Sequence, residues 1–314
     1  MALLNKRPEI RRSLILNRFL TLFSGDATIS SVHFFVCKQV LVADTLENNY
    51  NEIIKSNGGK AAMKDILISA KNLKKEFRTG ETSQTIFENL DLDIYKGDFT
   101  IIMGASGAGK STLMYSLSGM DRPTSGSIVF SDKEITKYND DELAVFRRKN
   151  CGFVFQQIYL LEKMSLMDNV LTAGALCSDN KKDVIKRAKE LFELVNIPEI
   201  TQKKFSTQVS GGEAQRAGIV RAVINKPSVV FADEPTGALN SNNSSAVLNV
   251  FTKLHREGQS IIMVTHDKKT ALRGNRILYV RDGQIFGDCD LGNYVESDNK
   301  RERKLDEFLT EMGW

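Results

Sequence analysis

The sequence predicts an α/β fold, and two observations lead to this prediction. From residue 63 onward, short apolar runs bounded by Gly and Pro alternate with segments of helical spacing, as they do in βαβ units. Residues 99–103, 229–232 and 261–264 form such runs, which are typical of strands buried on both faces of a parallel sheet. Residues 181–195 place apolar side chains at helical spacing, so we expect a helical part between the strands.

Two more elements are expected near the C-terminus. Residues 277–286 form two strand-like runs around Arg281-Asp282-Gly283, which predicts a β-hairpin. A final amphipathic helix is expected after Ser297. Its apolar face would carry Leu305, Phe308, Leu309 and Met312.

Composition excludes several classes of protein. The chain has 314 residues, of which 41% are hydrophobic and 26% are charged, so collagens, coiled-coil arrays and acidic disordered chains are excluded. The net charge of +4 is too small to indicate nucleic-acid binding. The four cysteines form no CxxC pair, which indicates neither a zinc site nor a disulfide framework. No apolar run approaches the length of a membrane span, so we expect any action at a membrane to go through a partner.

A glycine-rich segment follows the first predicted strand of the parallel sheet. Residues 104–111 match the phosphate-binding pattern GxxxxGK[ST], and residues 112–117 continue as a helix, which is the context this motif requires. The glycines allow backbone N–H groups to point at phosphate oxygens, while Lys110 offers a charge and Ser111 a hydroxyl for Mg²⁺. The alternative is a glycine-rich turn without a ligand, which the preceding strand disfavours. The expected phosphate-binding residues are Gly104, Ala105, Ser106, Gly107, Ala108, Gly109, Lys110, Ser111 and Thr112.

A pair of carboxylates ends the apolar run at 229–232. Asp233 is suited to hold Mg²⁺, directly or through water, and Glu234 to polarise an attacking water. An apolar strand that ends in Asp-Glu is common by itself. Together with the phosphate-binding loop, the pair predicts a site of nucleotide hydrolysis.

The segment Val209-Ser210-Gly211-Gly212-Glu213 resembles the LSGGQ signature of ATP-binding cassette ATPases. The order of phosphate-binding loop, Gln156, signature, Asp233-Glu234 and His266 is also that family's order, over residues 63–290. The resemblance implies a P-loop NTPase core with an antiparallel β part and an inserted α-helical signature subdomain at about 158–208. It also implies that the cofactors are ATP and Mg²⁺.

The resemblance assigns the signature residues to a partner. In the family, two subunits face head to tail, and Ser210, Gly211, Gly212 and Glu213 would cap the γ-phosphate held by the second subunit of a homodimer. The structural alternative is a capping box formed by Ser210 and Glu213 at the start of a helix. Capping and phosphate binding are compatible roles. The chain departs from the family with Val209 in place of Leu and Glu213 in place of Gln. The role of the Glu213 carboxylate is left open.

The remaining catalytic and metal-binding residues follow from the resemblance alone. Gln156 matches the glutamine that reaches Mg²⁺ and the attacking water, with the adjacent Gln157 as a competitor. His266 matches the histidine that contacts the γ-phosphate. The expected catalytic set is therefore Glu234, His266 and Gln156, and the expected metal set is Ser111, Gln156 and Asp233.

Two further positions match the family pattern. Phe77 matches the aromatic residue that stacks on adenine, where Tyr is common, and such stacking contributes about 1–3 kcal/mol. Read alone, Phe77 would be a core residue. Residues 237–240 match the D-loop, with Asn240 in place of the more usual Asp, which puts the coupling between subunits in question.

The segments 139–148, 152–157 and 233–239 are similar to the lipoprotein-release, macrolide-export and cell-division branch of the family, which includes antimicrobial-peptide exporters. This resemblance implies a cytoplasmic ATPase that is held at the inner face of the membrane by a separate integral-membrane permease. It also implies that the complex exports or extracts an antimicrobial peptide, lipid or lipoprotein. Permease docking is expected beside Tyr159, Leu160 and Leu161, although these residues are as readily explained as core.

Two alternatives differ in class. One is a nucleotide-dependent regulator of a membrane partner, as in the cell-division type. The other is a soluble cassette protein that acts on DNA or ribosomes. This second alternative is disfavoured because such proteins usually carry long coiled coils or two cassettes, so we expect no nucleic-acid partner.

The chain divides at a glycine-containing linker, residues 55–60. Residues 1–62 lack clear periodicity, and we expect them to be an N-terminal extension that is either disordered or a mis-assigned start, with Met63 as the initiator. The codons of Gly58-Gly59 can spell a ribosome-binding GGAGG, which favours the second interpretation, and a basic regulatory arm is the competing view. Residues 63–314 are expected to form the nucleotide-binding domain.

Overall fold

The computed structural model describes residues 64–80 and 82–314, and residues 64–314 form one compact unit. The expectations for residues 1–62 and for a start at Met63 lie outside the described residues. None of the helices in the described part of the chain is both long and apolar enough to cross a lipid bilayer.

The centre of the fold is a sheet of six strands in the order β10-β9-β3-β8-β7-β6. All neighbouring strands are parallel except β10, which pairs antiparallel with β9. The predicted strands and the predicted hairpin are confirmed. The bounds are β3 (Phe99–Met103), β6 (Cys151–Phe155), β7 (Val229–Asp233), β8 (Ser260–Val264), β9 (Arg276–Arg281) and β10 (Gln284–Asp290).

The register of this sheet brings the ends of three strands level with one another. Val264, the last residue of β8, pairs with Ile102 of β3 on one side and with Asp233 of β7 on the other. The residues that follow these strands therefore emerge side by side at the carboxyl edge, where ligands bind in open α/β sheets.

The sheet separates two hydrophobic cores because successive side chains of a strand point to opposite faces. Ile101 and Met103 of β3 belong to one buried cluster, and Ile102 between them belongs to the other. Every residue of β3 and β8 is buried. This explains why the sequence shows continuous apolar runs here rather than an alternating pattern.

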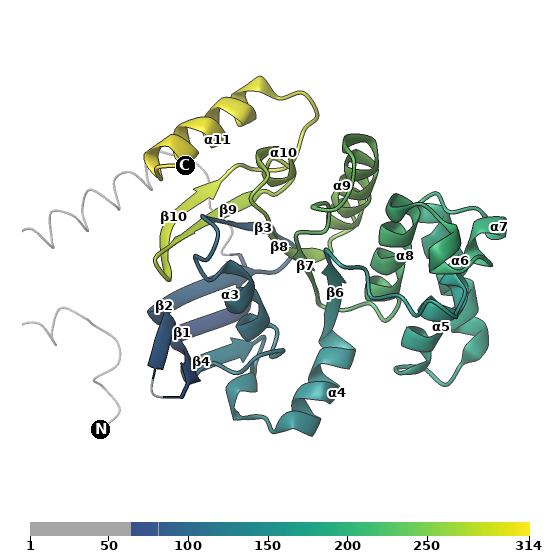
Figure 1. The fold of residues 1–314 in the computed structure, drawn as a ribbon, viewed down its shortest axis with the longest axis horizontal. Helices are drawn as coiled ribbons and strands as arrows, with labels where there is room; N and C mark the ends of the chain where they lie inside the picture. Colours follow the sequence, from purple (N-terminus) through teal and green to yellow (C-terminus); the bar gives the residue numbers. More distant parts are fainter. Residues whose placement is uncertain (1–63, 81) are drawn as a thin grey trace, which may run out of the picture. The chain divides into compact units, whose positions relative to one another are not determined.

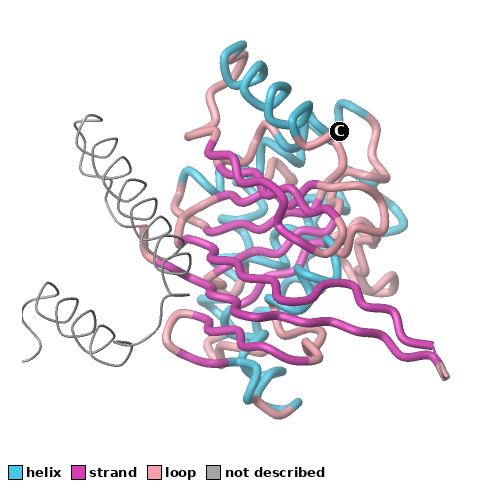
Figure 2. The backbone as a smooth tube through the Cα atoms, turned by 90° about the vertical axis from the view of Figure 1, so that its left-hand side faces the viewer, coloured by secondary structure: helices cyan, strands magenta, loops and turns pink. Residues whose placement is uncertain are grey.

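A second, antiparallel sheet has the order β2-β1-β4-β5. Its two long strands form a hairpin that projects beyond the other strands (Figure 2). The α/β fold with an antiparallel β part is thus confirmed. The bounds are β1 (Ile66–Thr79), β2 (Thr82–Tyr95), β4 (Ser125–Phe130) and β5 (Lys133–Glu134).

The helices that follow β6 form a lobe beside the sheet (Figure 1). This helical lobe comprises α5 (Leu166–Ala175), α6 (Lys181–Leu194), α7 (Glu199–Gln202), the 3₁₀ turn η2 (Ser206–Gln208) and α8 (Gly211–Val223). Its buried face includes Val170, Ala188, Phe192, Ala217 and Val220. The helix predicted over 181–195 is confirmed as α6, which buries Val184, Ala188, Leu191 and Phe192.

The other helices lie outside this lobe. They are α3 (Lys110–Leu117), η1 (Ile135–Lys137), α4 (Asp140–Asn150), α9 (Ser241–Arg256), α10 (Lys268–Ala271) and α11 (Asn299–Glu311). The expected last helix is confirmed as α11, which buries Leu305, Phe308 and Leu309. Met312 follows the helix as its C-cap, and a Cβ added to Gly287 of β10 would lie 2.4 Å from its sulfur. The helix therefore packs closely on β10.

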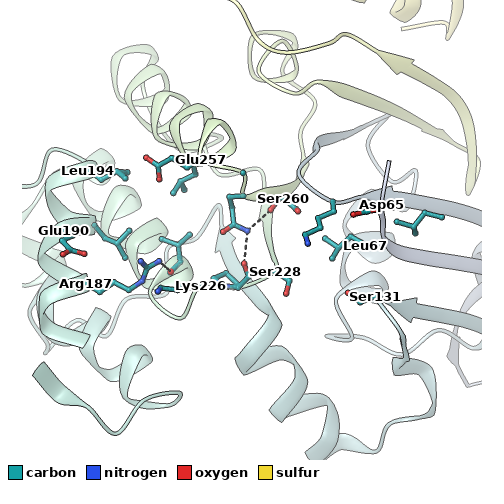
Figure 3. Close-up of a pocket in the computed structure, with 18 of the residues that line it drawn as sticks. Asp65, Leu67, Ser131, Arg187, Glu190, Leu194, Lys226, Ser228, Glu257 and Ser260 are labelled. Atoms are coloured by element: carbon teal, nitrogen blue, oxygen red, sulfur yellow. Dashed lines mark hydrogen bonds between the residues drawn. The ribbon is translucent and has the colours of Figure 1, made fainter. Parts of the chain in front are cut away.

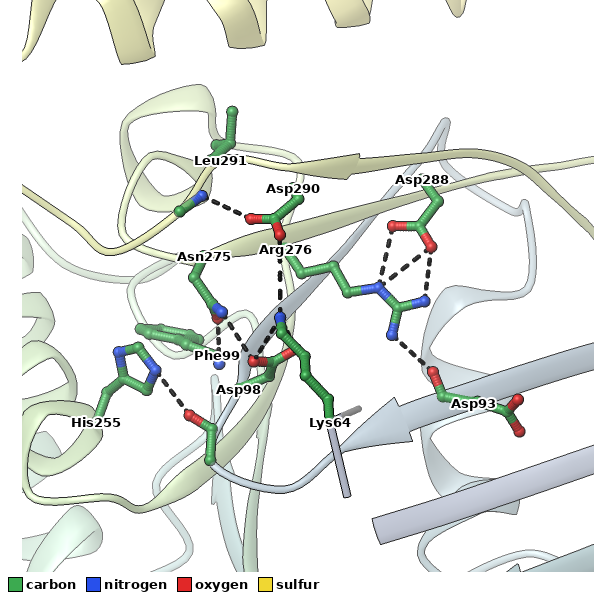
Figure 4. Close-up of polar contacts among 12 residues, drawn as sticks. Lys64, Asp93, Asp98, Phe99, His255, Asn275, Arg276, Asp288, Asp290 and Leu291 are labelled. Carbon is green, nitrogen blue, oxygen red and sulfur yellow. Dashed lines mark hydrogen bonds and ion pairs between the residues drawn. The ribbon is translucent and has the colours of Figure 1, made fainter. Parts of the chain in front are cut away.

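A polar network joins the antiparallel sheet to the parallel one (Figure 4). Asn275 Nδ2 donates to Asp98 Oδ1 at 2.9 Å, and Asn275 Oδ1 accepts from the Phe99 N–H at 2.6 Å. Arg276 at the start of β9 donates to the carbonyl of Asp93 in β2 at 2.6 Å. These buried bonds fix the hairpin of β1 and β2 relative to the strand that leads into the phosphate-binding loop.

Candidate active site

In the loop between β3 and α3, two glycines have backbone positions that leave no room for a side chain. A Cβ on Gly104, which has φ +147°, would lie 2.1 Å from the carbonyl oxygen of Val280. A Cβ on Gly109, with φ +89°, would lie 2.7 Å from Cγ2 of Ile86. The loop is therefore pressed between β9 and β2. Its curled backbone leads directly into the N-terminus of α3, a geometry that suits phosphate groups.

Lys110 is the first residue of α3 and is buried. Its Nζ donates to the carbonyls of Gly104 at 2.9 Å and Ala105 at 2.7 Å, so the ammonium lies inside the loop. Burial lowers the pKa of Lys110, and the carboxylates of Glu234 and Asp233 act in the opposite direction. A cation desolvated in this way is well placed to attract an anion that enters the loop.

Asp233, at the end of β7, accepts two hydrogen bonds from one face of α3. Ser111 Oγ donates to Asp233 Oδ1 at 2.9 Å, and the Tyr115 hydroxyl donates to Asp233 Oδ2 at 2.6 Å. Burial and this bond to Asp233 raise the pKa of Tyr115. Serine hydroxyl and carboxylate oxygens are hard ligands of the kind that Mg²⁺ prefers, so the pair fits this ion.

Tyr115 is a site residue that sequence reasoning missed. The available signal was its position four residues after Ser111, which places both side chains on one face of the helix.

Glu234 and His266 come from adjacent strand ends and meet. Glu234 has φ +43°, in the left-handed region that is strained for a residue with a side chain. Its N–H donates to the carbonyl of Val264 at 3.0 Å, and its Oε1 lies 2.8 Å from His266 Nδ1. The strained backbone is thus held by β8 and turns the carboxylate toward His266.

These groups surround one cavity of about 740 Å³. Most of the predicted phosphate-binding residues line it, together with Glu234 and His266. Gly104, Ala105 and Ala108 do not line it. The carbonyls of Gly104 and Ala105 accept from Lys110, and the Ala108 N–H donates to the Ala105 carbonyl. Gln84 and Ile86 of β2 complete the wall, and no local sequence pattern marked them because tertiary packing brings β2 here. The lining residues are Gln84, Ile86, Ser106, Gly107, Gly109, Lys110, Ser111, Thr112, Glu234 and His266.

Gln156 and Phe77 lie near this cavity without lining it. Gln156 follows β6, and a Cβ on Gly237 would lie 2.9 Å from its Nε2, so its amide is held against the predicted D-loop. Phe77 on β1 is 45% exposed, and its cross-strand partner Gln84 lines the cavity. The Nζ of Lys75 lies 4.7 Å from the centroid of the Phe77 ring.

The signature turn begins α8 and is separate from the cavity. Ser210 and Glu213 form the capping box that the sequence allowed. Gly211 is close to the start of α9, since its added Cβ would lie 3.4 Å from Leu239, and one on Gly212 would lie 2.6 Å from Asn243. None of residues 210–213 is among those that line the cavity. Within one chain, the two predicted phosphate-binding elements do not meet.

A larger cavity, of about 860 Å³, lies at the opposite edge of the sheet, where β7 and β8 begin (Figure 3). Its lining mixes bases such as Arg187 and Lys226 with acids such as Glu190 and Glu257. Arg187 already donates to the carbonyls that end α8. The mixed charge and the engaged guanidinium do not define a ligand class.

The combination of features at the carboxyl edge defines a class of protein. A strand, a glycine loop and a helix enclose a buried lysine. Next to this lysine, a serine is hydrogen-bonded to an aspartate, a pair suited to Mg²⁺. A glutamate beside a histidine faces the cavity that the loop lines. This is the arrangement of a P-loop nucleotide hydrolase.

Comparison with known proteins identifies the family. A family model described as ABC transporter matches residues 87–237. The ATP-binding protein YknY of Bacillus subtilis is 39% identical over 219 residues, which cover 70% of this chain and 95% of YknY. The macrolide export ATP-binding/permease protein MacB of Chlorobaculum tepidum is 41% identical over 222 residues, 71% of this chain. The chain belongs to the ATP-binding cassette (ABC) transporter family, as its sequence motifs indicated.

The solved structures place it among the ATPase cassettes. The ATP-binding cassette MJ0796, in a dimeric post-hydrolysis state bound to ADP and Pi, is 33% identical with a TM-score of 0.67, over 72% of this chain and all of that one. The chain is an ABC ATPase that uses ATP with Mg²⁺. The matched part is about a third of the length of the MacB relatives, 34% in Chlorobaculum tepidum, which carry ATP-binding and permease functions by name.

Tyr115→Phe removes the hydroxyl that orients Asp233 and leaves the ring in place. Loss of a residue that hydrogen-bonds to a metal ligand typically costs about 10–100-fold in metal affinity or activity. We therefore expect the Mg²⁺ concentration for half-maximal ATPase activity to rise by about tenfold. Titration of ATPase activity with Mg²⁺ measures this. Tyr138→Phe, on a ring that packs against Phe146, is the matched control. An unchanged Mg²⁺ requirement in Tyr115→Phe would contradict the assigned role.

Proposed function

We propose that this chain is the ATP-hydrolysing subunit of an ABC transporter and pairs head to tail with a second copy around two Mg-ATP. The separation of the signature turn from the phosphate cavity carries this proposal. A cavity that lacks its second anion-binding element is completed when a partner supplies it. The dimeric state of the MJ0796 cassette supports the same arrangement.

Each group in the cavity has a role in hydrolysis under this proposal. The loop N–H groups and Lys110 bind the phosphates, and Glu234 orients and polarises the attacking water. His266, hydrogen-bonded to Glu234, steadies that carboxylate and contacts the γ-phosphate. Mg²⁺, when bound with ATP, would be held by Ser111 and Asp233 with Gln156 nearby, and would neutralise phosphate charge. Phe77, at the hairpin, would stack on the adenine.

The second subunit would contribute Ser210, Gly211, Gly212 and Glu213. The start of α8 is a helix N-terminus with free N–H groups, which attracts anions. Asn240, where Asp is more usual in the family, caps α9, because its side chain accepts from the Asn243 N–H at 3.0 Å. Asn243 also lies close to Gly212, and Leu239 of the D-loop lies close to Gly211.

A separate integral-membrane permease is the proposed partner, and it would hold the ATPase at the inner face of the membrane. The ATP-binding/permease name of the MacB relatives supports this. Tyr159 and Leu161 are 60% and 55% exposed, and Arg221 donates to the Tyr159 carbonyl and holds the turn in place. Leu160 packs on the core instead. We propose that Tyr159 and Leu161, with Met164 and Phe205 beside them, form the docking surface.

The cargo class proposed is an antimicrobial peptide, lipid or lipoprotein, which the resemblance of segments 139–148, 152–157 and 233–239 to that branch of the family implies. We further propose that residues 63–314 act as one nucleotide-binding domain, with a helical subdomain at about 158–208 that leads into the signature.

Glu234→Gln keeps the size and position of the side chain but removes the base. We expect ATPase activity to fall at least about 100-fold, while ATP binding persists and an ATP-bound dimer accumulates. Phosphate release and sedimentation velocity with Mg-ATP measure the two effects. Glu257→Gln, at the other cavity, should behave as wild type. Undiminished turnover, or a Glu234→Gln protein that stays monomeric with ATP, would overturn the proposal.

Leu161→Glu places a charge in the proposed docking surface. Burial of an unpaired carboxylate in an apolar contact is costly, so we expect the variant to lose co-purification with the proposed permease. Leu176→Glu changes an exposed leucine elsewhere in the helical lobe and should retain co-purification. Equal retention by both variants would place docking elsewhere on the molecule.

A further inference from the structure

Glu213 binds the one hydroxyl that the signature turn offers. Its Oε2 accepts from the Ser210 N–H at 2.9 Å and from the Ser210 Oγ–H at 2.8 Å, while Ser210 Oγ accepts from the Glu213 N–H at 3.3 Å. A hydroxyl has a single proton to donate. In the free subunit that proton is directed to Glu213, so Ser210 has none for another acceptor.

Glu213 also places negative charge at the start of α8. The hydrogen bonds from Ser210 lower the pKa of Glu213, so its carboxylate is ionised at neutral pH. Arg216 and Lys204 face the same carboxylate and favour its charge. The partial positive charge of the helix N-terminus, which would attract a phosphate, is offset by this carboxylate.

We infer that Glu213 is a positioning residue that sets the ATP concentration at which two subunits pair. To meet the partner's γ-phosphate, Ser210 must release its proton from Glu213, and the carboxylate must approach a group of like charge. A glutamine would keep the acceptor oxygen for the Ser210 N–H and would offer an N–H donor to the phosphate. This inference rests on the proposed head-to-tail pairing.

The test compares Glu213→Gln with its parent in full-length chains that also carry Glu234→Gln, so that hydrolysis does not consume the ATP. Sedimentation velocity gives the ATP concentration for half-maximal dimer in the presence of Mg²⁺. We expect this concentration to be about tenfold lower in Glu213→Gln at about 50 mM NaCl. The difference should shrink at about 0.5 M NaCl, because salt screens the repulsion between the carboxylate and the phosphate.

The chain contains a matched control for this change. At the start of α5, Ser165 Oγ donates to Asp168 Oδ2 at 2.6 Å, and the Asp168 N–H donates to Ser165 Oγ at 3.0 Å. Asp168→Asn therefore removes one charge from the same kind of cap in the same lobe. It should leave the ATP concentration for pairing unchanged.

Comparison of Glu213→Ala with Glu213→Gln separates charge from capping. It removes the carboxylate and the capping contact together, so the melting temperature should fall while the ATP requirement and its salt dependence still drop. A residue that only caps the helix would change the melting temperature and not the salt dependence.

Three results would count against the inference in different ways. An ATP requirement in Glu213→Gln equal to or above that of the parent overturns it, and so does an equal drop in Asp168→Asn. If Glu234→Gln alone does not pair with ATP, the proposed dimer itself fails, and the inference fails with it. A lowered, salt-sensitive requirement confined to the Glu213 variants supports it.

Discussion

Burial of strands β3, β7 and β8 on both faces is the constraint on which the site depends. Strands with no exposed face cannot carry charged side chains along their length, because burial of an unpaired charge is costly. The one charged side chain within β3, β7 and β8 is Asp233, which stands where β7 ends. Since Val264 pairs with both Ile102 and Asp233, those ends are level, and the phosphate loop, the carboxylates and His266 converge there.

Close contacts then fix the distances within the site. Gly104 lies against the β9 carbonyl of Val280, which leaves no room for a side chain, so the loop packs directly on the sheet. On the other side of β9, the nearly fully buried Arg301 of α11 donates to carbonyls that follow α10 and β10, including those of Leu272 and Leu291. The hairpin of β9 and β10, with α11 packed on it, thus supports the phosphate loop. This contact gives α11 a structural role.

Sequence reasoning predicted what local patterns specify. The apolar runs gave β3, β7 and β8, and the spacing of Gly, Lys and Ser located the loop and its helix. It did not find Tyr115 or Ile86, whose places at the site depend on how α3 and β2 pack. The choice between Gln156 and Gln157 rested on resemblance and stays a prediction. The Gln156 amide lies against Gly237, a neighbour far away in sequence that no local pattern indicates. The roles assigned to the site residues remain predictions that the experiments address.

The capping box and the phosphate-binding role of the signature are not competing descriptions. In the free subunit the capping box occupies the Ser210 hydroxyl and the Glu213 N–H, two donors at the helix start that an anion could otherwise use, so capping limits anion binding. A helix start with these donors occupied is stable alone but offers fewer of them to an anion. We infer that Glu213, in place of the family's Gln, favours the capped helix of the free subunit over pairing with a second subunit. Stability of the separate chain and affinity for its partner are in this way adjusted by one side chain.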